Sequence, residues 1–141
     1  MKKLILCLAA VFICFSLTAC TGHLSKSEIF SLVQDNHAFL LECIGDDRLD
    51  RAAQVRGIES AYADKNGAYV EFCCGGAGLV PSSSYYGFYY SPDDLPLAVD
   101  VTDTKDLVPA GSGYGWKQPG GDNRYYTERI LENWYYYESH Y

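Results

Sequence analysis

The chain has 141 residues, with 18 Asp or Glu against 11 Lys or Arg, which gives a formal net charge of −7 at neutral pH. This length suits one domain. The acidity argues against a nucleic-acid-binding protein, because phosphates attract a basic surface, and against electrostatic docking on anionic lipid. All 13 tyrosines fall between Tyr62 and Tyr141. Because tyrosine favours half-buried strand surfaces, the C-terminal region is expected to form a sheet.

Residues 1–19 have the parts of a bacterial export signal. Two lysines precede an uncharged apolar run that ends at Leu17 and is too short for a permanent membrane-spanning helix. The Leu-Thr-Ala-Cys sequence that ends at Cys20 resembles the lipobox of bacterial lipoproteins. The resemblance implies cleavage before Cys20, diacylglycerol on its sulfur and acyl chains such as palmitate. The protein would then be lipid-anchored at the extracytoplasmic face of the cell membrane. A plain secretory signal or an uncleaved signal anchor is the alternative.

The next segment predicts an amphipathic helix over residues 26–44. Residues 20–25 would form a lipidated Cys with a short tether, and residues 26–141 a single domain. Ser25 and Glu28 have the spacing of a capping box, in which each side chain bonds the backbone amide of the other residue. Apolar residues then follow at helical spacing, and Gly45 stands where a left-handed C-cap is expected.

After the helix the pattern changes to that of strands. Residues 55–63 and 68–74 flank Asp-Lys-Asn-Gly, a sequence typical of hairpin turns. Residues 75–84 are rich in Gly and Ser and predict a loop. Further strands are expected at residues 85–91, 97–101, 113–118, 123–131 and 134–141. A helix over residues 125–133 is the alternative, but the flanking aromatic residues favour strands.

These elements predict an α+β fold in which one N-terminal amphipathic helix packs on a curled antiparallel sheet of five to seven short strands. As an edge or terminal strand, the last segment would place Trp134 and Tyr136 on one face and Tyr135 and Tyr137 on the other. We expect one face to meet the helix and the other to meet water, with the tyrosine hydroxyls pointing outward.

Three cysteines remain after Cys20. A disulfide between Cys43 and Cys74 is geometrically sensible if the helix covers the sheet face that carries Cys74. Buried free thiols are the alternative. Cys73 could instead be a nucleophile, with His37 or His140 as its base and the Gly-rich segment after it as an oxyanion hole.

Metal and cofactor sites are not expected. The cysteines and histidines lack zinc spacing, and the acidic turns lack the EF-hand pattern, so solvated carboxylates are the simpler interpretation. These carboxylates belong to Asp93, Asp94, Asp100, Asp103, Asp106 and Asp122. No Ser-His-Asp arrangement can be singled out, because residues 82–84 fall in the expected loop without an obvious partner.

The aromatic residues exceed the number that a core of this size needs. Rings on a rigid sheet can stack on sugars or hold peptide side chains. The candidate ligand-binding residues are Tyr86, Tyr90, Trp116, Tyr126, Trp134 and Tyr136. We therefore expect a non-enzymatic binding module for a glycan or an envelope protein. The alternatives are an envelope hydrolase or transferase that uses Cys73 or the Asp93–Asp94 pair, and a structural subunit of an envelope complex. Core and rim filling is the other interpretation of the rings.

Residues 85–94 and 115–130 resemble small tyrosine-rich lipoproteins and secreted domains of Gram-positive anaerobes. This resemblance implies a location and a scaffold, and it brings no activity that could be transferred to the chain.

Overall fold

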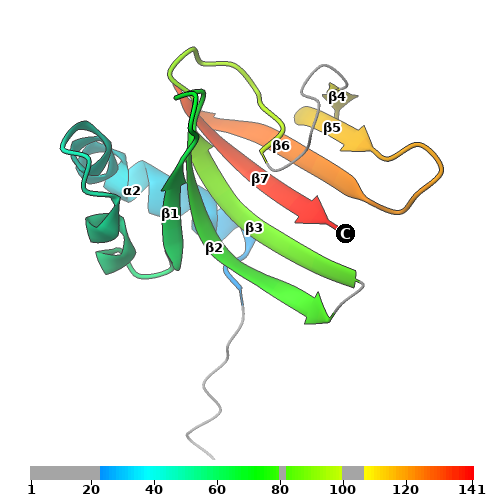
Figure 1. The fold of residues 1–141 in the computed structure, drawn as a ribbon, viewed down its shortest axis with the longest axis horizontal. Helices are drawn as coiled ribbons and strands as arrows, with labels where there is room; N and C mark the ends of the chain where they lie inside the picture. Colours follow the sequence, from blue (N-terminus) through cyan, green and yellow to red (C-terminus); the bar gives the residue numbers. More distant parts are fainter. Residues whose placement is uncertain (1–22, 80–81, 100–106) are drawn as a thin grey trace, which may run out of the picture.

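The computed structural model describes residues 23–79, 82–99 and 107–141. It contains the helix α2 (Lys26–Gly45), the 3-10 helix η2 (Leu49–Gln54) and an open antiparallel sheet with the strand order β1-β2-β3-β7-β6-β5-β4 (Figure 1). The strands are β1 (Ser60–Ala63), β2 (Val70–Leu79), β3 (Ser82–Tyr90), β4 (Val108–Ala110), β5 (Gly113–Lys117), β6 (Arg124–Leu131) and β7 (Trp134–His140). The prediction of one helix followed by a mostly antiparallel sheet is confirmed. The expected signal segment and Cys20 lie outside the described residues.

The helix α2 begins as predicted and ends differently. The Ser25 N–H donates to a Glu28 carboxylate oxygen at 2.7 Å, and the Glu28 N–H donates to Ser25 Oγ, so the capping box is confirmed. Gly45 is not the left-handed residue at the other end. That conformation is taken by Asp47, with φ 53°, and the Arg48 N–H then donates to a carbonyl in the last turn. Aspartate tolerates the left-handed region better than most residues. Within the described residues no helix is both long and apolar enough to span a membrane.

The first hairpin is confirmed, but the second strand is longer than predicted. β1 pairs with β2, and the turn closes through the Gly67 N–H to the Asp64 carbonyl, with Gly67 at φ 72°. The predicted loop over residues 75–84 is wrong in its described part, because β2 continues to Leu79 and pairs with the start of β3 at Ser82. A bulge between Cys73 and Gly76 permits this continuation, and Gly75 takes φ 124° there.

The last strand lies in the middle of the sheet, not at its edge. β7 pairs with β3 on one side and with β6 on the other (Figure 1). The strand predicted over residues 123–131 is formed at Arg124–Leu131, and the alternative helix is not. The expected strand over residues 97–101 is not formed in its described part, residues 97–99. These residues belong to an irregular segment, residues 91–99, which we call the strap.

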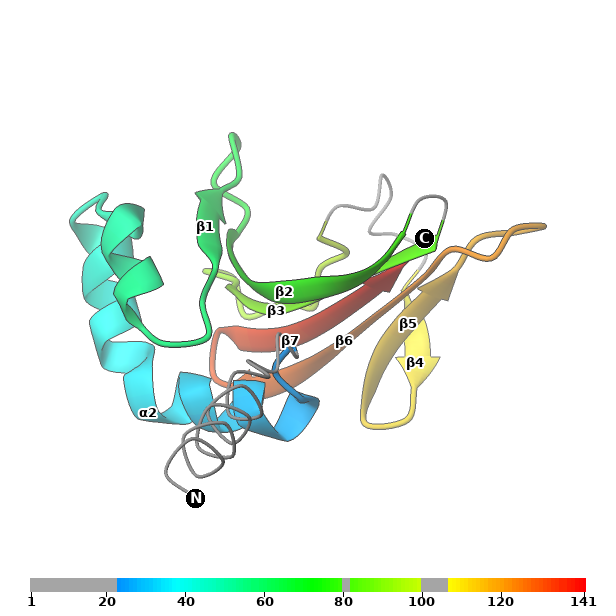
Figure 2. The same cartoon turned by 90° about the horizontal axis from the view of Figure 1, so that it is seen from below.

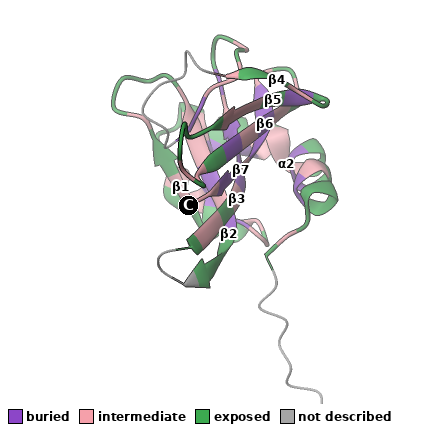
Figure 3. Ribbon diagram, turned by 90° about the vertical axis from the view of Figure 1, so that its right-hand side faces the viewer, coloured by how far each residue is buried: buried purple, intermediate pink, exposed green. Residues whose placement is uncertain are grey.

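One face of the sheet, the helix-side face, is covered by α2 (Figure 2). Its core combines apolar residues of the helix with Phe72, Phe88, Trp134 and Tyr136 of the strands. Phe72 stacks on Phe88 with 4.8 Å between ring centroids. In Figure 3 the buried residues follow the central strands and the side of α2 that faces them.

The opposite face, the loop-side face, is only partly open to water, unlike the prediction. The strap covers it and packs Ala98 and Val99 against tyrosines of β3, β6 and β7. These tyrosines are Tyr89, Tyr125, Tyr135 and Tyr137. Their hydroxyls point inward, contrary to the prediction. The Leu97 N–H donates to the Tyr89 hydroxyl at 2.8 Å, and the Tyr125 hydroxyl donates to the Leu97 carbonyl at 2.9 Å.

Candidate functional site

The six aromatic residues predicted to bind a ligand do not share one surface. Trp134 and Tyr136 are 2 % exposed and belong to the helix-side core, so their assignment as ligand contacts is wrong. The reason is the central position of β7, which places both under α2. Tyr86, Tyr90 and Tyr126 are half-buried at the rim of this core, and Trp116 is half-buried beside the loop-side layer.

Two of the rim tyrosines hold the N-terminal end of the described chain. The ring of His23 stacks on Tyr86, with 4.4 Å between centroids and an interplanar angle of 9°. The Lys26 ammonium pairs with Glu128 and lies 5.1 Å from the centroid of the Tyr126 ring. The Tyr126 hydroxyl donates to the same carboxylate at 2.6 Å. These contacts fix the start of α2 on the helix-side face.

The ionisation of this cluster follows from its contacts. Burial opposes the charge of Glu128, but the hydrogen bonds from Lys26 and Tyr126 outweigh it and lower the pKa of the carboxyl group. Burial, together with the adjacent carboxylate, raises the pKa of Tyr126 to about 12. At neutral pH the cluster therefore contains one carboxylate, one ammonium and one neutral phenol.

A serine, a histidine and a glutamate meet at the end of β7, which sequence reasoning missed. His140 Nδ1 lies 2.7 Å from Ser84 Oγ, and His140 Nε2 lies 3.8 Å from a Glu138 oxygen. Ser84 and His140 are cross-strand partners that do not exchange backbone hydrogen bonds, since the neighbouring Ser83–Tyr141 pair does. Side chains approach most closely at such pairs. Only the strand pairing brings the two together, so no local sequence signal could have identified them.

This arrangement resembles a catalytic triad, with Ser84 as the nucleophile, His140 as its base and Glu138 as the carboxylate beside the base. Two features argue against that role. The 3.8 Å separation between His140 and Glu138 exceeds a hydrogen bond, and the Glu138 carboxylate instead accepts from the Tyr136 hydroxyl at 2.9 Å. Ser84 also lies within a paired strand, whose amides point to neighbouring strands, whereas an oxyanion hole needs amides that face the substrate. The geometry supports binding better than acyl transfer.

Cys73 is not arranged as a nucleophile. Burial raises the pKa of its thiol, and the charges of Glu59 and Glu71 raise it further. A reactive cysteine needs the opposite shift. Neither predicted base is its hydrogen-bond partner, because His140 contacts Ser84 and His37 contacts the Gln34 carbonyl.

The predicted disulfide between Cys43 and Cys74 is not formed. Both side chains are buried free thiols, and Cys73 is a half-buried free thiol. The helix α2 packs against β6, β7 and η2, whereas Cys74 is on β2. Cys43 is in the last turns of α2, near η2. The disulfide prediction assumed that this part of the helix covers β2.

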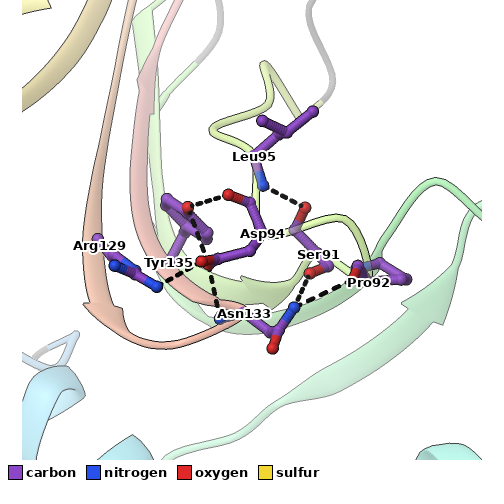
Figure 4. Close-up of polar contacts among 7 residues, drawn as sticks. All are labelled: Ser91, Pro92, Asp94, Leu95, Arg129, Asn133 and Tyr135. Carbon is purple, nitrogen blue, oxygen red and sulfur yellow. Dashed lines mark hydrogen bonds and ion pairs between the residues drawn. The ribbon is translucent and has the colours of Figure 1, made fainter.

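Asp94 has a structural role at the point where two turns meet (Figure 4). Its carboxylate pairs with Arg129 and accepts the Asn133 N–H at 2.8 Å, and its backbone carbonyl accepts the Tyr135 hydroxyl at 2.8 Å. The Asn133 side chain donates in turn to the Ser91 and Pro92 carbonyls. Because these donors occupy the Asp94 carboxylate, it clamps the strap to the β6–β7 turn. The neighbouring Asp93 is exposed.

Metal-binding groups are also limited. Within residues 23–79, 82–99 and 107–141, no three or more His, Cys, Asp or Glu side chains are grouped so that they could hold an ion. The expected acidic residues Asp100, Asp103 and Asp106 lie outside the described part of the chain.

The exposed tyrosines gather on the loop-side face, away from the helix. Tyr85 is 45 % exposed, and its ring lies edge-to-face with Tyr141 at 6.1 Å between centroids. We call these two residues the terminal tyrosine pair. Tyr114, which is 40 % exposed, is on the same face, as its partner Thr127 in β6 shows. The sequence prediction selected Tyr86, the neighbour of Tyr85, because both faces of β3 are aromatic and alternation could not separate them.

A hollow of about 250 Å³ adjoins the terminal tyrosine pair. It is lined by Gly76, Ala77, Gly78, Ser83, Ser84 and Tyr85. Gly76 lies opposite Tyr85, and a Cβ there would come within 3.0 Å of the Tyr85 ring and 2.8 Å of the Ser84 carbonyl. A side chain at position 76 would therefore displace the ring and close the hollow. Ser139 of β7 is the cross-strand partner of Tyr85. Its hydroxyl oxygen is buried and has no hydrogen-bond partner among the described residues.

Comparison of the chain with protein-family models, with curated proteins and with solved structures found no match.

Proposed function

We propose that the protein is a lipid-anchored binding module at the extracytoplasmic face of a bacterial cell membrane, with an envelope glycan as its ligand. The observation that carries the proposal is the terminal tyrosine pair, in which Tyr85 is exposed and Tyr141 half-buried, beside a glycine-floored hollow. Aromatic rings on a rigid sheet offer a flat apolar surface at low entropic cost, and sugars present matching apolar ring faces. The backbone of the hollow and the hydroxyl of Ser83 supply polar partners.

The lipid anchor rests on the lipobox-like sequence that ends at Cys20. Cys20 is three residues before His23, so it can lie no more than about 11 Å from it. His23 is held against Tyr86 on the helix-side face. The anchor would therefore join the domain on the helix-side face, while the terminal tyrosine pair is on the opposite face. This arrangement leaves the proposed glycan surface directed away from the membrane.

The side chains that an enzyme would need, the Cys73 thiol and the Asp94 carboxylate, are not arranged for catalysis. The Cys73 thiol has a raised pKa, and the Asp94 carboxylate clamps two turns. These observations favour a binding module over a cysteine hydrolase or transferase.

Binding of chitohexaose and cellohexaose to the full chain in detergent micelles, measured by calorimetry, tests the proposal. We expect Tyr85→Ala to weaken binding by about tenfold, which corresponds to roughly 1.4 kcal/mol. The matched control is Tyr62→Ala, since Tyr62 is 49 % exposed on the edge strand β1. Equal effects of the two substitutions, or no binding of either sugar, would count against a glycan site. If the chain instead binds an envelope protein, and Tyr85→Ala abolishes that binding, the ligand is a protein and not a glycan.

A further inference from the structure

A row of basic and polar residues crosses four neighbouring strands on the helix-side face. Lys117 of β5 is opposite Arg124 of β6, Arg124 is opposite His140 of β7, and His140 is opposite Ser84 of β3. Directly opposed residues project from the same side of a sheet. Adjacent strands are about 4.8 Å apart, so the row extends over roughly 14 Å. We call these four residues the basic row.

The pairing of Lys117 with Arg124 is unfavourable for the fold itself. Like charges directly opposite each other on a sheet destabilise it. Within the described residues neither side chain forms an ion pair, whereas Lys26, Arg51 and Arg129 each do. Both Lys117 and Arg124 are exposed. An anion bound from outside would neutralise the repulsion, so the pair is better explained by a ligand than by stability.

The remaining members of the row are suited to the same ligand. The contact between Ser84 Oγ and His140 Nδ1 at 2.7 Å fixes the His140 ring and leaves Nε2 as the nitrogen that can donate to an anion. None of the neighbouring Asp and Glu carboxylates that the structure describes forms an ion pair with Lys117 or Arg124. Glu138 accepts from the Tyr136 hydroxyl and lies near His140, and Glu128 pairs with Lys26. Asp122, in the turn next to Arg124, forms no ion pair among the described residues.

The basic row lies beside the place where the chain leaves the domain. The next row along the same strands is Tyr86, Glu138 and Tyr126. Two residues along a strand correspond to about 7 Å. Tyr86 holds His23, so the chain exit and the basic row share the helix-side face.

We propose that Lys117, Arg124 and His140 bind the phosphate groups of anionic lipid headgroups, and that the helix-side face is therefore the surface of the domain that rests on the membrane. This inference builds on the lipid anchor proposed above. The overall charge of −7 argued against electrostatic contact with lipid. The basic row shows why that argument fails locally, since membrane attraction acts on charges within about 10 Å of the surface and not on the net charge.

The experiment uses the full chain, isolated with its lipid and reconstituted into two kinds of vesicle. One contains phosphatidylcholine alone, and the other also contains phosphatidylglycerol at about 30 mol%, enough to give a negative surface potential. Acylation of individual lysines by a water-soluble ester is followed by mass spectrometry. Lys65, exposed in the β1–β2 turn, is the internal control for Lys117.

We expect phosphatidylglycerol to slow the acylation of Lys117 by about threefold and to leave Lys65 within about 1.5-fold, because headgroup phosphates shield only the docked ammonium. Arg124→Gln should abolish most of this protection. Arg56→Gln, a substitution of an exposed arginine outside the row, should retain it.

Three outcomes would overturn the proposal. The first is equal acylation of Lys117 in both kinds of vesicle. The second is equal protection of Lys65. The third is protection of Lys117 by soluble polyphosphate in phosphatidylcholine vesicles without protection by phosphatidylglycerol, which would assign the row to a free polyanion. A chain that floats with neither kind of vesicle contradicts the lipid anchor itself, whereas a chain that floats with both but shows no protection contradicts only the membrane-facing row.

Discussion

The two faces of the central sheet are buried by different means. On the helix-side face, α2 covers an apolar core that includes Phe72, Phe88 and Trp134. On the loop-side face, the irregular strap covers a layer of tyrosines, and their hydroxyls bond to its backbone. A helix satisfies its own amides and carbonyls, so an apolar surface suits it, whereas an irregular segment needs polar partners where it is buried. This contrast explains why the protein is rich in tyrosine.

The layer of tyrosines has a further feature that the apolar core lacks. Tyr137 extends across β3 at Gly87 and donates to the Glu71 carboxylate on β2. Gly87 is the residue that makes this crossing possible, because a Cβ there would lie 2.8 Å from the Tyr137 ring. The loop-side layer is therefore held by directed hydrogen bonds as well as by burial.

The largest expected effect on the loop-side layer should appear at alkaline pH. Burial raises the pKa of Tyr89, Tyr125 and Tyr137, and the Glu71 charge adds to the rise for Tyr137. An unfolded tyrosine ionises near pH 10, so stability is complete below that pH and is lost above it. At pH 11.5 these three residues should contribute about 6 kcal/mol to the loss of unfolding free energy. Tyr126, Tyr135 and Tyr136, whose pKa values are also raised, add to this loss. Urea unfolding at pH 8 and pH 11.5 measures this loss.

A single substitution connects the alkaline effect to the loop-side layer. Tyr137→Phe should remove roughly 2 kcal/mol of the pH dependence. Phe88→Leu, on the helix-side face, should lower stability equally at both pH values. The same pH dependence in Tyr137→Phe as in the parent protein would show that this tyrosine does not retain its proton in the folded state.

On the helix-side face, Phe72→Ala should reduce the free energy of unfolding by about 4 kcal/mol, because it empties a fully buried site between two rings. Denaturant unfolding at pH 7 measures this value. Leu95→Ala, at a residue that is 56 % exposed, is the control and should cost less than about 0.5 kcal/mol. A cost below about 1 kcal/mol for Phe72→Ala would mean that α2 does not pack on the sheet as described.

Gly87→Ala should cost about 3 kcal/mol, because the added Cβ would lie 2.3 Å from the Phe72 carbonyl oxygen as well as against the Tyr137 ring. Thermal unfolding compares it with Gly67→Ala. Gly67 has φ 72° but no atom near its Cβ position, so only backbone strain of about 1 kcal/mol is expected there. Equal costs at both positions would contradict the crossing of Tyr137 over β3.

The smallest of these effects belongs to one hydroxyl. Tyr89→Phe should cost about 2 kcal/mol, because it leaves the half-buried Leu97 N–H and the buried Thr127 hydroxyl without this partner. Amide exchange at Leu97 should also accelerate, whereas Tyr62→Phe, at an exposed residue, should change neither quantity. Unchanged exchange at Leu97 would indicate that the strap is not held by Tyr89.

The elements that depend on neighbouring residues were predictable from the sequence. The capping box of Ser25 and Glu28 and the spacing of the apolar residues that follow predict α2, and Asp-Lys-Asn-Gly predicts the first hairpin. These signals act over a few residues, so they need no knowledge of the fold.

The features that depend on strand order were not predictable. The central position of β7 converts Trp134 and Tyr136 from candidate ligand contacts into core residues. The bulge at Gly75 changes a predicted loop into a strand. The meeting of Ser84 with His140 likewise follows from pairing between strands that are distant in sequence.

The measurement that tests the account most directly is an intact-mass spectrum of the protein purified from its native membrane, with and without alkylation in denaturant. We predict a chain that begins at Cys20, carries the mass of diacylglycerol and its acyl chains, and gains three alkyl groups on Cys43, Cys73 and Cys74. A chain that begins at Met1 without added lipid mass would contradict the anchor and with it the membrane-facing role of the helix-side face. Alkylation of one thiol instead of three would show a disulfide that the described fold does not contain.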